Sequence, residues 1–149
     1  MNRDNPGLFE NENCDATHAS FRIQGINLIP AEITKILKLA PTYSHGKGDQ
    51  LKGKSDDRQR MSGMWLISSA EAVKSTSLER HISFLLERLE TVTSQIQLLK
   101  SDESVEIDFL CYWASRTGHG GPVLSSGVLS RLGALCHVVN FDYYGPYED

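Results

Sequence analysis

The chain has 149 residues, of which 40% are hydrophobic and 23% charged, and its formal net charge is −4. This length and composition predict one globular domain, and the acidic balance argues against a protein that holds nucleic acid through its phosphates. No apolar stretch approaches the ~20 residues of a membrane-spanning helix, and the polar start is unlike a secretory signal or transit peptide. We therefore expect a cytoplasmic protein that binds neither nucleic acid nor a membrane.

The first part of the chain predicts a tail, a strand and a helix. Residues 1–17 are rich in Asn, Asp and Glu and lack periodicity, which is typical of a flexible tail, so we place the single domain at 18–149. Phe21 and Ile23 alternate with polar residues, as in a strand with one exposed face. Pro30 then begins a predicted helix. Its expected buried face consists of Ile33, Ile36 and Leu37.

Residues 43–60 form the most polar interior segment and predict a hairpin loop or a mobile excursion. Lys54 and Arg58 belong to a run of basic residues here that could meet a phosphate or an acidic partner. Asp residues interspersed among them favour a solvated loop instead. The apolar stretch at 61–70 that follows predicts a strand.

Residues 76–100 predict one long amphipathic helix. Thr76 and Glu79 have the spacing of a capping box at its start. Apolar residues then recur every three or four positions, which favours a helix lying across a sheet. The same rhythm could form a coiled coil, and with it an oligomeric structural protein. The stripe consists of Leu78, Ile82, Leu85, Leu89, Val92, Ile96 and Leu99.

The last third predicts a strand over 104–115 with apolar residues on both faces, a helix over 125–135, and a strand over 137–145. The order of elements predicts an α+β fold. We expect a mainly antiparallel sheet of about five strands with helices on one face. Its core would have the ferredoxin-like βαββαβ order, followed by an added αβ unit.

The sequence RTGHGGPVLSS at residues 116–126 is the strongest candidate for a functional loop. It lacks the Lys of a phosphate-binding Walker loop, and Val123 stands where a dinucleotide-binding motif has its last glycine. An esterase oxyanion loop would need a G-x-S-x-G element, and the chain has none. We therefore interpret the glycines as a bend and Ser125 or Ser126 as a helix cap. The alternative is an anion site at the helix start, with Arg116 and His119 nearby.

Other side chains carry weaker signals. Asp108 and Asp142 lie in predicted strands, where a carboxylate can act as acid or base or can pair with Arg22 or Arg116. Tyr144 is a candidate for partner contact. The three cysteines and five histidines lack the spacings of disulfide frameworks and metal sites, so we expect no metal and no cofactor.

Several short motifs together resemble one family. These are F-x-I-x-G at 21–25, G-x-W at 63–65, G-P-x-L-S at 121–125 and the closing D-Y at 142–143. Over residues 19–144 the chain resembles a bacterial family known only as a domain of unknown function, numbered 4279. The resemblance implies a small single-domain protein, and it brings no catalytic residues.

These observations favour a non-enzymatic domain that binds a protein partner, because no reactive constellation meets its geometric requirements. A specific version is an immunity-type protein that neutralises a basic toxin by charge complementarity. The alternative is an anion binder, small-molecule binder or small enzyme that uses the loop from Arg116 to Ser126, with Asp108 or Asp142 as acid or base and Lys54 or Arg58 nearby. The sequence leaves the oligomeric state open.

Overall fold

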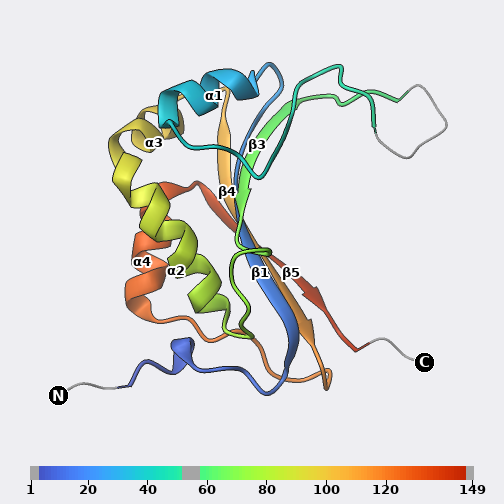
Figure 1. Cartoon of the computed structure of the whole chain (residues 1–149), viewed down its shortest axis with the longest axis vertical. Coiled ribbons are helices and arrows are strands. Elements are labelled where there is room, and N and C mark those ends of the chain that lie inside the picture. Colours follow the sequence, from blue (N-terminus) through green and yellow to red (C-terminus); the bar gives the residue numbers. More distant parts are fainter. Residues whose placement is uncertain (1–3, 52–57, 147–149) are drawn as a thin grey trace.

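The fold is built on a five-stranded sheet in the order β2-β3-β1-β4-β5 (Figure 1). The computed structural model describes residues 4–51 and 58–146. The strands are β1 (Cys14–Gly25), β2 (Tyr43–His45), β3 (Gly63–Ser68), β4 (Glu106–Ser115) and β5 (Val138–Tyr144). The helices are α1 (Pro30–Leu37), α2 (Leu78–Leu89), α3 (Thr93–Lys100) and α4 (Ser126–Leu135), with short 3-10 helices η1 (Pro6–Leu8) and η2 (Glu90–Val92).

The central strand β1 is antiparallel to both of its neighbours, with Arg22 opposite Leu66 of β3 and Asp108 of β4. Strand β2 is antiparallel to β3, whereas β5 is parallel to β4. The first four strands with α1 and α2 therefore have the ferredoxin-like order, and α4 with β5 forms the added unit. All the α-helices lie on one face of the sheet (Figure 1). The predicted α+β fold is confirmed.

The core lies between the sheet and this helical layer. Phe21, Trp65, Phe109 and Trp113 extend from the sheet and are almost completely buried, and each such side chain stabilises the fold by roughly 2–3 kcal/mol. The predicted stripe of α2 and α3 covers them. Its members are buried apart from Val92, which is partly buried against the same core. An oligomer joined through this stripe is not compatible with its burial in a single chain.

The predicted long helix is in fact two helices. Helix α2 ends at Leu89, and Val92 leaves helical geometry with φ −128° and ψ 32° before α3 begins. The β-branched residues around this break have low helix propensity, and the Thr91 hydroxyl donates back to the Arg88 carbonyl at 2.6 Å. The N-cap is also one residue later than predicted, since the Ser77 hydroxyl accepts from the Arg80 N–H at 3.2 Å.

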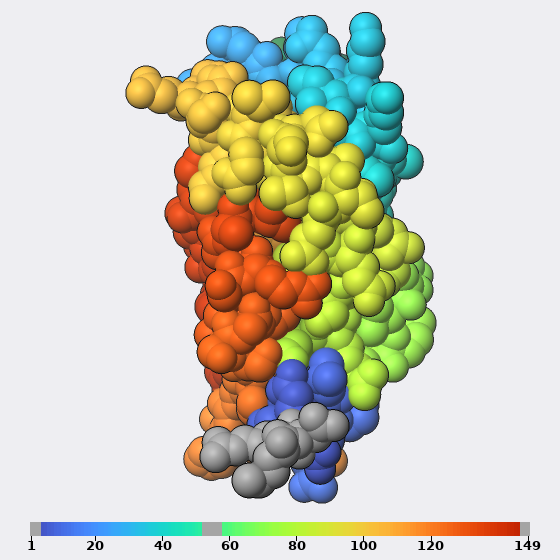
Figure 2. Space-filling view, turned by 90° about the vertical axis from the view of Figure 1, so that its left-hand side faces the viewer, coloured from blue at the N-terminus to red at the C-terminus, as the bar shows by residue number. Residues whose placement is uncertain are grey.

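The N-terminal segment differs most from its prediction. Strand β1 already begins at Cys14, and the described residues before it lie against the helical layer (Figure 2). Arg80 Nε donates to the Leu8 carbonyl at 2.7 Å, and the Thr76 N–H donates to Glu10 at 2.7 Å. Residues 4–17 are therefore not a free tail. The acidic Glu10, which suggests disorder by its type, is used here as a hydrogen-bond partner for the residues just before α2.

Candidate functional site

The 116–126 loop is a glycine bend, as predicted. Gly118 and Gly120 have φ values of 81° and 80°, in the left-handed region that favours glycine. The Ser115 hydroxyl accepts from the Gly118 N–H at 2.9 Å and donates to the His119 carbonyl at 2.9 Å. Ser125 caps α4, because its hydroxyl accepts from the Val128 N–H at 3.3 Å. Local hydrogen bonds thus account for the shape of the loop.

The start of α4 already holds a carboxylate from the chain itself. Glu79 of α2 is almost completely buried, and its Oε1 accepts from the Ser125 N–H at 2.5 Å. The Asn5 side-chain amide donates to the other oxygen of the same carboxylate. A helix N-terminus attracts negative charge. Here an internal acid occupies the position that the anion alternative assigns to an external ligand.

The remaining candidates lie far apart. Arg116 donates from its backbone to the Asn13 carbonyl at 2.7 Å and from its guanidinium to the Glu12 carbonyl, while the His119 side chain is exposed. Arg58 belongs to the segment that leads into the Gly63 end of β3, and this segment lies at the opposite end of the sheet from the 116–126 loop (Figure 1). Lys54 lies outside the described residues. The described candidates therefore do not converge on one pocket with this loop.

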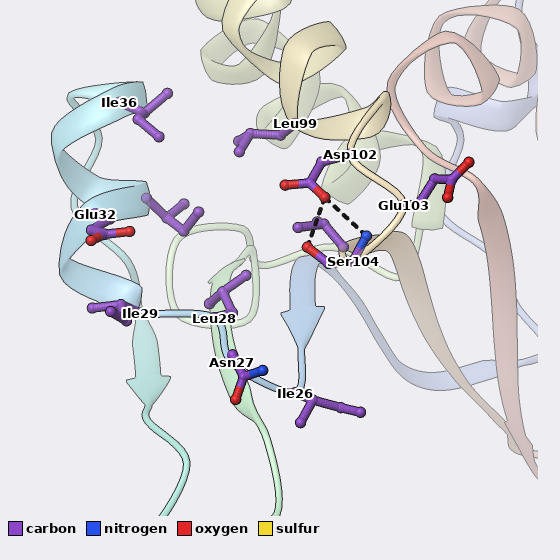
Figure 3. Close-up of a pocket in the computed structure, with 12 residues that line it drawn as sticks. Ile26, Asn27, Leu28, Ile29, Glu32, Ile36, Leu99, Asp102, Glu103 and Ser104 are labelled. Atoms are coloured by element: carbon purple, nitrogen blue, oxygen red, sulfur yellow. Dashed lines mark hydrogen bonds between the residues drawn. The ribbon is translucent and has the colours of Figure 1, made fainter.

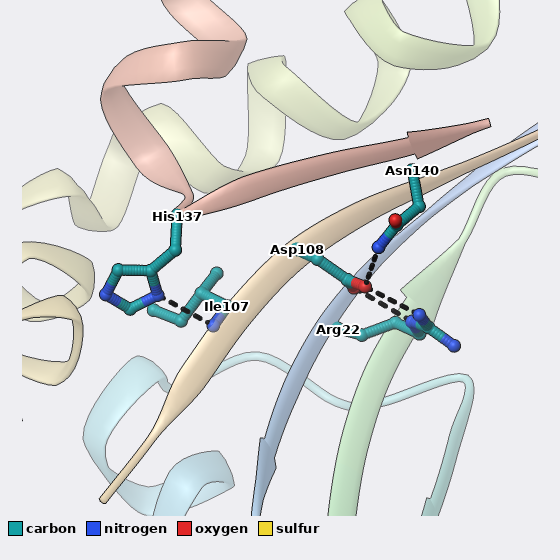
Figure 4. A network of polar contacts seen from close by, with 5 residues as sticks. All are labelled: Arg22, Ile107, Asp108, His137 and Asn140. Carbon is teal, nitrogen blue, oxygen red and sulfur yellow. Dashed lines mark hydrogen bonds and ion pairs between the residues drawn. The ribbon is translucent and has the colours of Figure 1, made fainter. Parts of the chain in front are cut away.

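Asp108 pairs with Arg22 on the helix-free face of the sheet (Figure 4). Arg22 Nε and Nη2 donate to the two carboxylate oxygens at 2.8 and 2.6 Å. Asn140 Nδ2 donates to Asp108 Oδ2 at 2.9 Å. These hydrogen bonds to the Asp108 carboxylate raise the pKa of the Arg22 guanidinium. This carboxylate joins β1, β4 and β5, which is a structural role and fits the pairing alternative for Asp108.

His137 makes a second connection at the start of β5 (Figure 4). Its Nδ1 accepts from the Ile107 N–H at 3.0 Å, and its Nε2 lies 2.8 Å from the Lys100 carbonyl. The proton of the neutral ring must therefore be on Nε2, which donates to that carbonyl. The histidine fixes the point where β5 enters the sheet.

Strand β5 forms an exposed sheet edge that carries two candidates, Asp142 and Tyr144. It is paired with β4, and Phe141 on it is 51% exposed. Tyr143 stacks on Trp113 with ring centroids 5.4 Å apart, and the Tyr144 ring packs against Tyr112 at 5.3 Å. Among the described residues, the other edge strand, β2, spans three residues. Strand β5 is thus the longer edge strand, and its exposed side chains are mainly apolar and aromatic.

A pocket of about 530 Å³ lies between the β1–α1 loop, α1 and the α3–β4 loop (Figure 3). Ile26, Ile29 and Ile36 contribute apolar surface, and Glu32 and Asp102 contribute carboxylates. The sequence-based prediction missed this pocket because it placed Ile36 on the buried face of α1, whereas Ile36 is 43% exposed. The available signal was the presence of Ile26, Leu28 and Ile29 in one short segment, which is unusual for a loop.

The thiols are poor candidates for chemistry. Cys14, Cys111 and Cys136 are free and buried, and burial raises the pKa of Cys111 to about 12, so its reactive thiolate is scarce at neutral pH. In the parts of the chain that the structure describes, no three His, Cys, Asp or Glu side chains gather as a metal-binding group.

The comparisons with known proteins identify the family. The family described as Domain of unknown function (DUF4279) matches residues 15–146. The chain belongs to this family. Searches of the curated proteins and of the solved structures found no match. Within the described part of this DUF4279 chain, no helix is long and apolar enough to cross a membrane. The family match confirms the resemblance.

One buried and one partly buried histidine, His81 and His18, predict that the domain loses stability in mild acid. His81 Nδ1 lies 2.7 Å from the Ser69 hydroxyl, and burial lowers the pKa of both His81 and His18 below the ordinary 6.5. As the pH falls below 6.5, the unfolded chain binds more protons than the folded one. The free energy of unfolding should therefore decrease from that pH down to the lowered pKa values of the folded state.

Urea unfolding at pH values between about 7.5 and 5 would measure this loss. Glu10 interferes little, because hydrogen bonds from Ser75 and Thr76 lower its pKa from 4.5 to about 2, and the stability linked to this shift is lost mainly below pH 4.5. His18→Gln should reduce the pH dependence, and the exposed His119→Gln should leave it unchanged. An unfolding free energy that is constant over this range would contradict the prediction.

Proposed function

We propose that this protein is a non-enzymatic protein-binding domain whose partner adds a strand to the outer edge of β5. The observation that carries the proposal is the combination of length, apolar character and exposure of this edge. Edge strands are usually protected by shortness, Lys, Pro or a covering element. Strand β5 has seven residues, VVNFDYY, without Lys, Arg or Pro. An edge of this kind is suited to pairing with another chain.

The side chains of β5 would give such a complex its specificity. Strand addition uses backbone hydrogen bonds for affinity and alternate side chains for selection. Because the β4–β5 register aligns Trp113 with Tyr143 and Ala114 with Tyr144, the two tyrosines lie on opposite faces of the sheet. Both rings already rest on neighbouring aromatic residues. Binding would therefore cost little side-chain entropy.

Charge favours a basic partner. The chain carries a net charge of −4, and β5 itself contains Asp142 and no cation. Opposite charge accelerates association and disfavours wrong partners. We propose more specifically an immunity-type role, in which the domain binds and neutralises a basic toxin in the bacterial cytoplasm. The three free, buried cysteines support a reducing compartment.

Two features weigh against the enzymatic and anion-binding alternatives. Asp108, a candidate acid or base, is fully occupied by Arg22 and Asn140. The helix start beside the 116–126 loop holds Glu79. A ligand in this loop would have to displace a buried carboxylate that also bonds the N-terminal segment.

Native mass spectrometry of the protein purified gently from its own cells tests the proposal. We expect an added mass of several kilodaltons on the 16.6 kDa chain. Phe141→Lys should remove this mass, because a charge on the edge would be buried by a pairing strand. Leu98→Lys on α3 is the matched control, since Leu98 is 73% exposed and lies on a helix and not on the edge strand.

Two results would overturn the proposal. The first is a complex that Phe141→Lys retains at the wild-type level while its circular dichroism stays native. The second is a bare chain that also fails to form a stoichiometric complex with any toxin encoded beside its gene.

A further inference from the structure

We infer that the pocket between α1 and the α3–β4 loop is a second site, which binds an apolar organic cation. The ligand class is an alkyl or aryl group that carries an ammonium or guanidinium. The inference is independent of the β5 edge, because no residue of β5 lines this pocket.

The apolar part of the ligand is indicated by the pocket wall. Ile26 and Ile29 lie in one short loop, and their side chains are 65% and 54% exposed. Ile36 on α1 adds its side chain to the same wall. Partly buried Leu28 and buried Leu99 form the adjoining surface. The volume of about 530 Å³ lies within the range of small-molecule sites, roughly 300–1,000 Å³. A ligand that covered these side chains would remove apolar surface from water.

The charged part of the ligand is indicated by two carboxylates on opposite sides of this surface. Glu32 extends from α1, Asp102 extends from the α3–β4 loop, and apolar side chains lie between them (Figure 3). The Ser104 N–H and hydroxyl donate to Asp102 at 2.9 and 2.7 Å. These bonds fix the carboxylate and lower its pKa, so it stays anionic.

The acids of the pocket have no basic neighbour within its described lining. Among the described residues that line it there is no Lys, Arg or His, and Glu103 adds a third acid at the rim. An anionic ligand would meet this negative field at close range. A neutral apolar ligand would bind the wall and leave the carboxylates unpaired. An apolar cation would both cover the apolar wall and pair with the carboxylates. Its positive charge would make it bind more tightly than a neutral or anionic ligand of the same size.

Methyl NMR with three probes of equal chain length tests this inference. Octylammonium, octanol and octanoate would each be titrated below their aggregation limits, and the isoleucine methyl signals would be followed. We expect octylammonium to shift the signals of Ile26, Ile29 and Ile36 at the lowest concentration, octanol to require more, and octanoate to bind weakest. Equal affinity of the three probes, no binding of octylammonium, or shifts confined to other parts of the molecule would overturn the inference.

Substitution of the acids separates charge recognition from apolar contact. Glu32→Gln and Asp102→Asn should each weaken octylammonium binding roughly three- to fivefold and leave octanol binding unchanged. Glu87→Gln is the control, because Glu87 is an exposed acid of α2 outside this pocket. If octylammonium binding were insensitive to both pocket variants, the assigned role of the carboxylates would be wrong.

One more titration identifies the source of the cation. A short peptide with leucine next to lysine represents a partner segment, and octylammonium represents a small molecule. Tighter binding of the peptide would assign the pocket to a protein partner, and tighter binding of octylammonium would assign it to a free amine. Phe141→Lys should leave either affinity unchanged, so failure of the β5 proposal and failure of this one are distinguishable.

Discussion

Replacing Gly63 with alanine is expected to destabilise the domain by about 3 kcal/mol or more. Gly63 begins β3, where the β1–α1 loop crosses it, and a Cβ added there would lie 2.0 Å from the Leu28 carbonyl oxygen. The obstacle is backbone, so a side-chain rotation cannot relieve it. Either the loop or the Gly25–Gly63 pairing would have to shift. Urea unfolding would measure the loss, and the pocket beside Leu28 should deform with it.

Gly133→Ala is the matched control for this prediction. Gly133 lies in α4, and a Cβ there meets nothing within 4 Å. Alanine in a helix interior is favoured over glycine by roughly 0.5–1 kcal/mol, so this variant should gain stability. The same Gly→Ala change is therefore expected to lower the stability at position 63 and to raise it at position 133. Equal effects at the two sites would show that the contact with Leu28 does not constrain β3.

The second large effect concerns the pair on the helix-free face of the sheet. Asp108→Ala should cost about 3 kcal/mol, because it leaves the Arg22 guanidinium in a largely buried position without its carboxylate. The side chains of Arg22 and Asp108 are 21% and 3% exposed. The double variant Arg22→Met with Asp108→Leu should recover much of this loss, since it removes both charges and keeps the volume.

The exposed ion pair between Arg131 and Glu90 provides the comparison. Its side chains are 44% and 38% exposed, and solvent weakens such a pair to about 1 kcal/mol or less. Chemical denaturation of Asp108→Ala and Glu90→Ala should therefore give clearly different losses. Similar losses of unfolding free energy would mean that burial does not decide how much the Arg22–Asp108 pair contributes to stability.

The fold was predictable because its strands carry clear periodic signals. Phe21 and Ile23 alternate with polar residues, and this pattern reports directly which face of a strand is buried. The helix break at Val92 was harder to predict, because the apolar rhythm continues through it. The apolar spacing shows only which side of the helix is buried. The break depends on local backbone geometry, which a small difference in helix propensity can decide.

The candidate site was less predictable, because its parts come from distant segments. The sequence limited the helix cap to Ser125 or Ser126, since capping is a local property, and the structure shows that it is Ser125. It could not show that Glu79 reaches that helix start from α2, or that Asn5 joins them. The pocket was hard to predict for the same reason. Ile26 and Ile36 belong to adjacent elements, but Asp102 meets them only through the packing of α3 near α1.

The central position of β1 has a consequence for synthesis of the chain. One long side of this strand pairs with β4, so that Arg22 and Asp108, 86 residues apart, must meet. While a ribosome is still making the first hundred residues, that side of β1 has no strand to pair with. Phe21 and Ile23 would then depend on β3 and α2 alone for cover. Such an intermediate is exposed to aggregation, and the middle strand of the finished sheet is among the last to be fully secured.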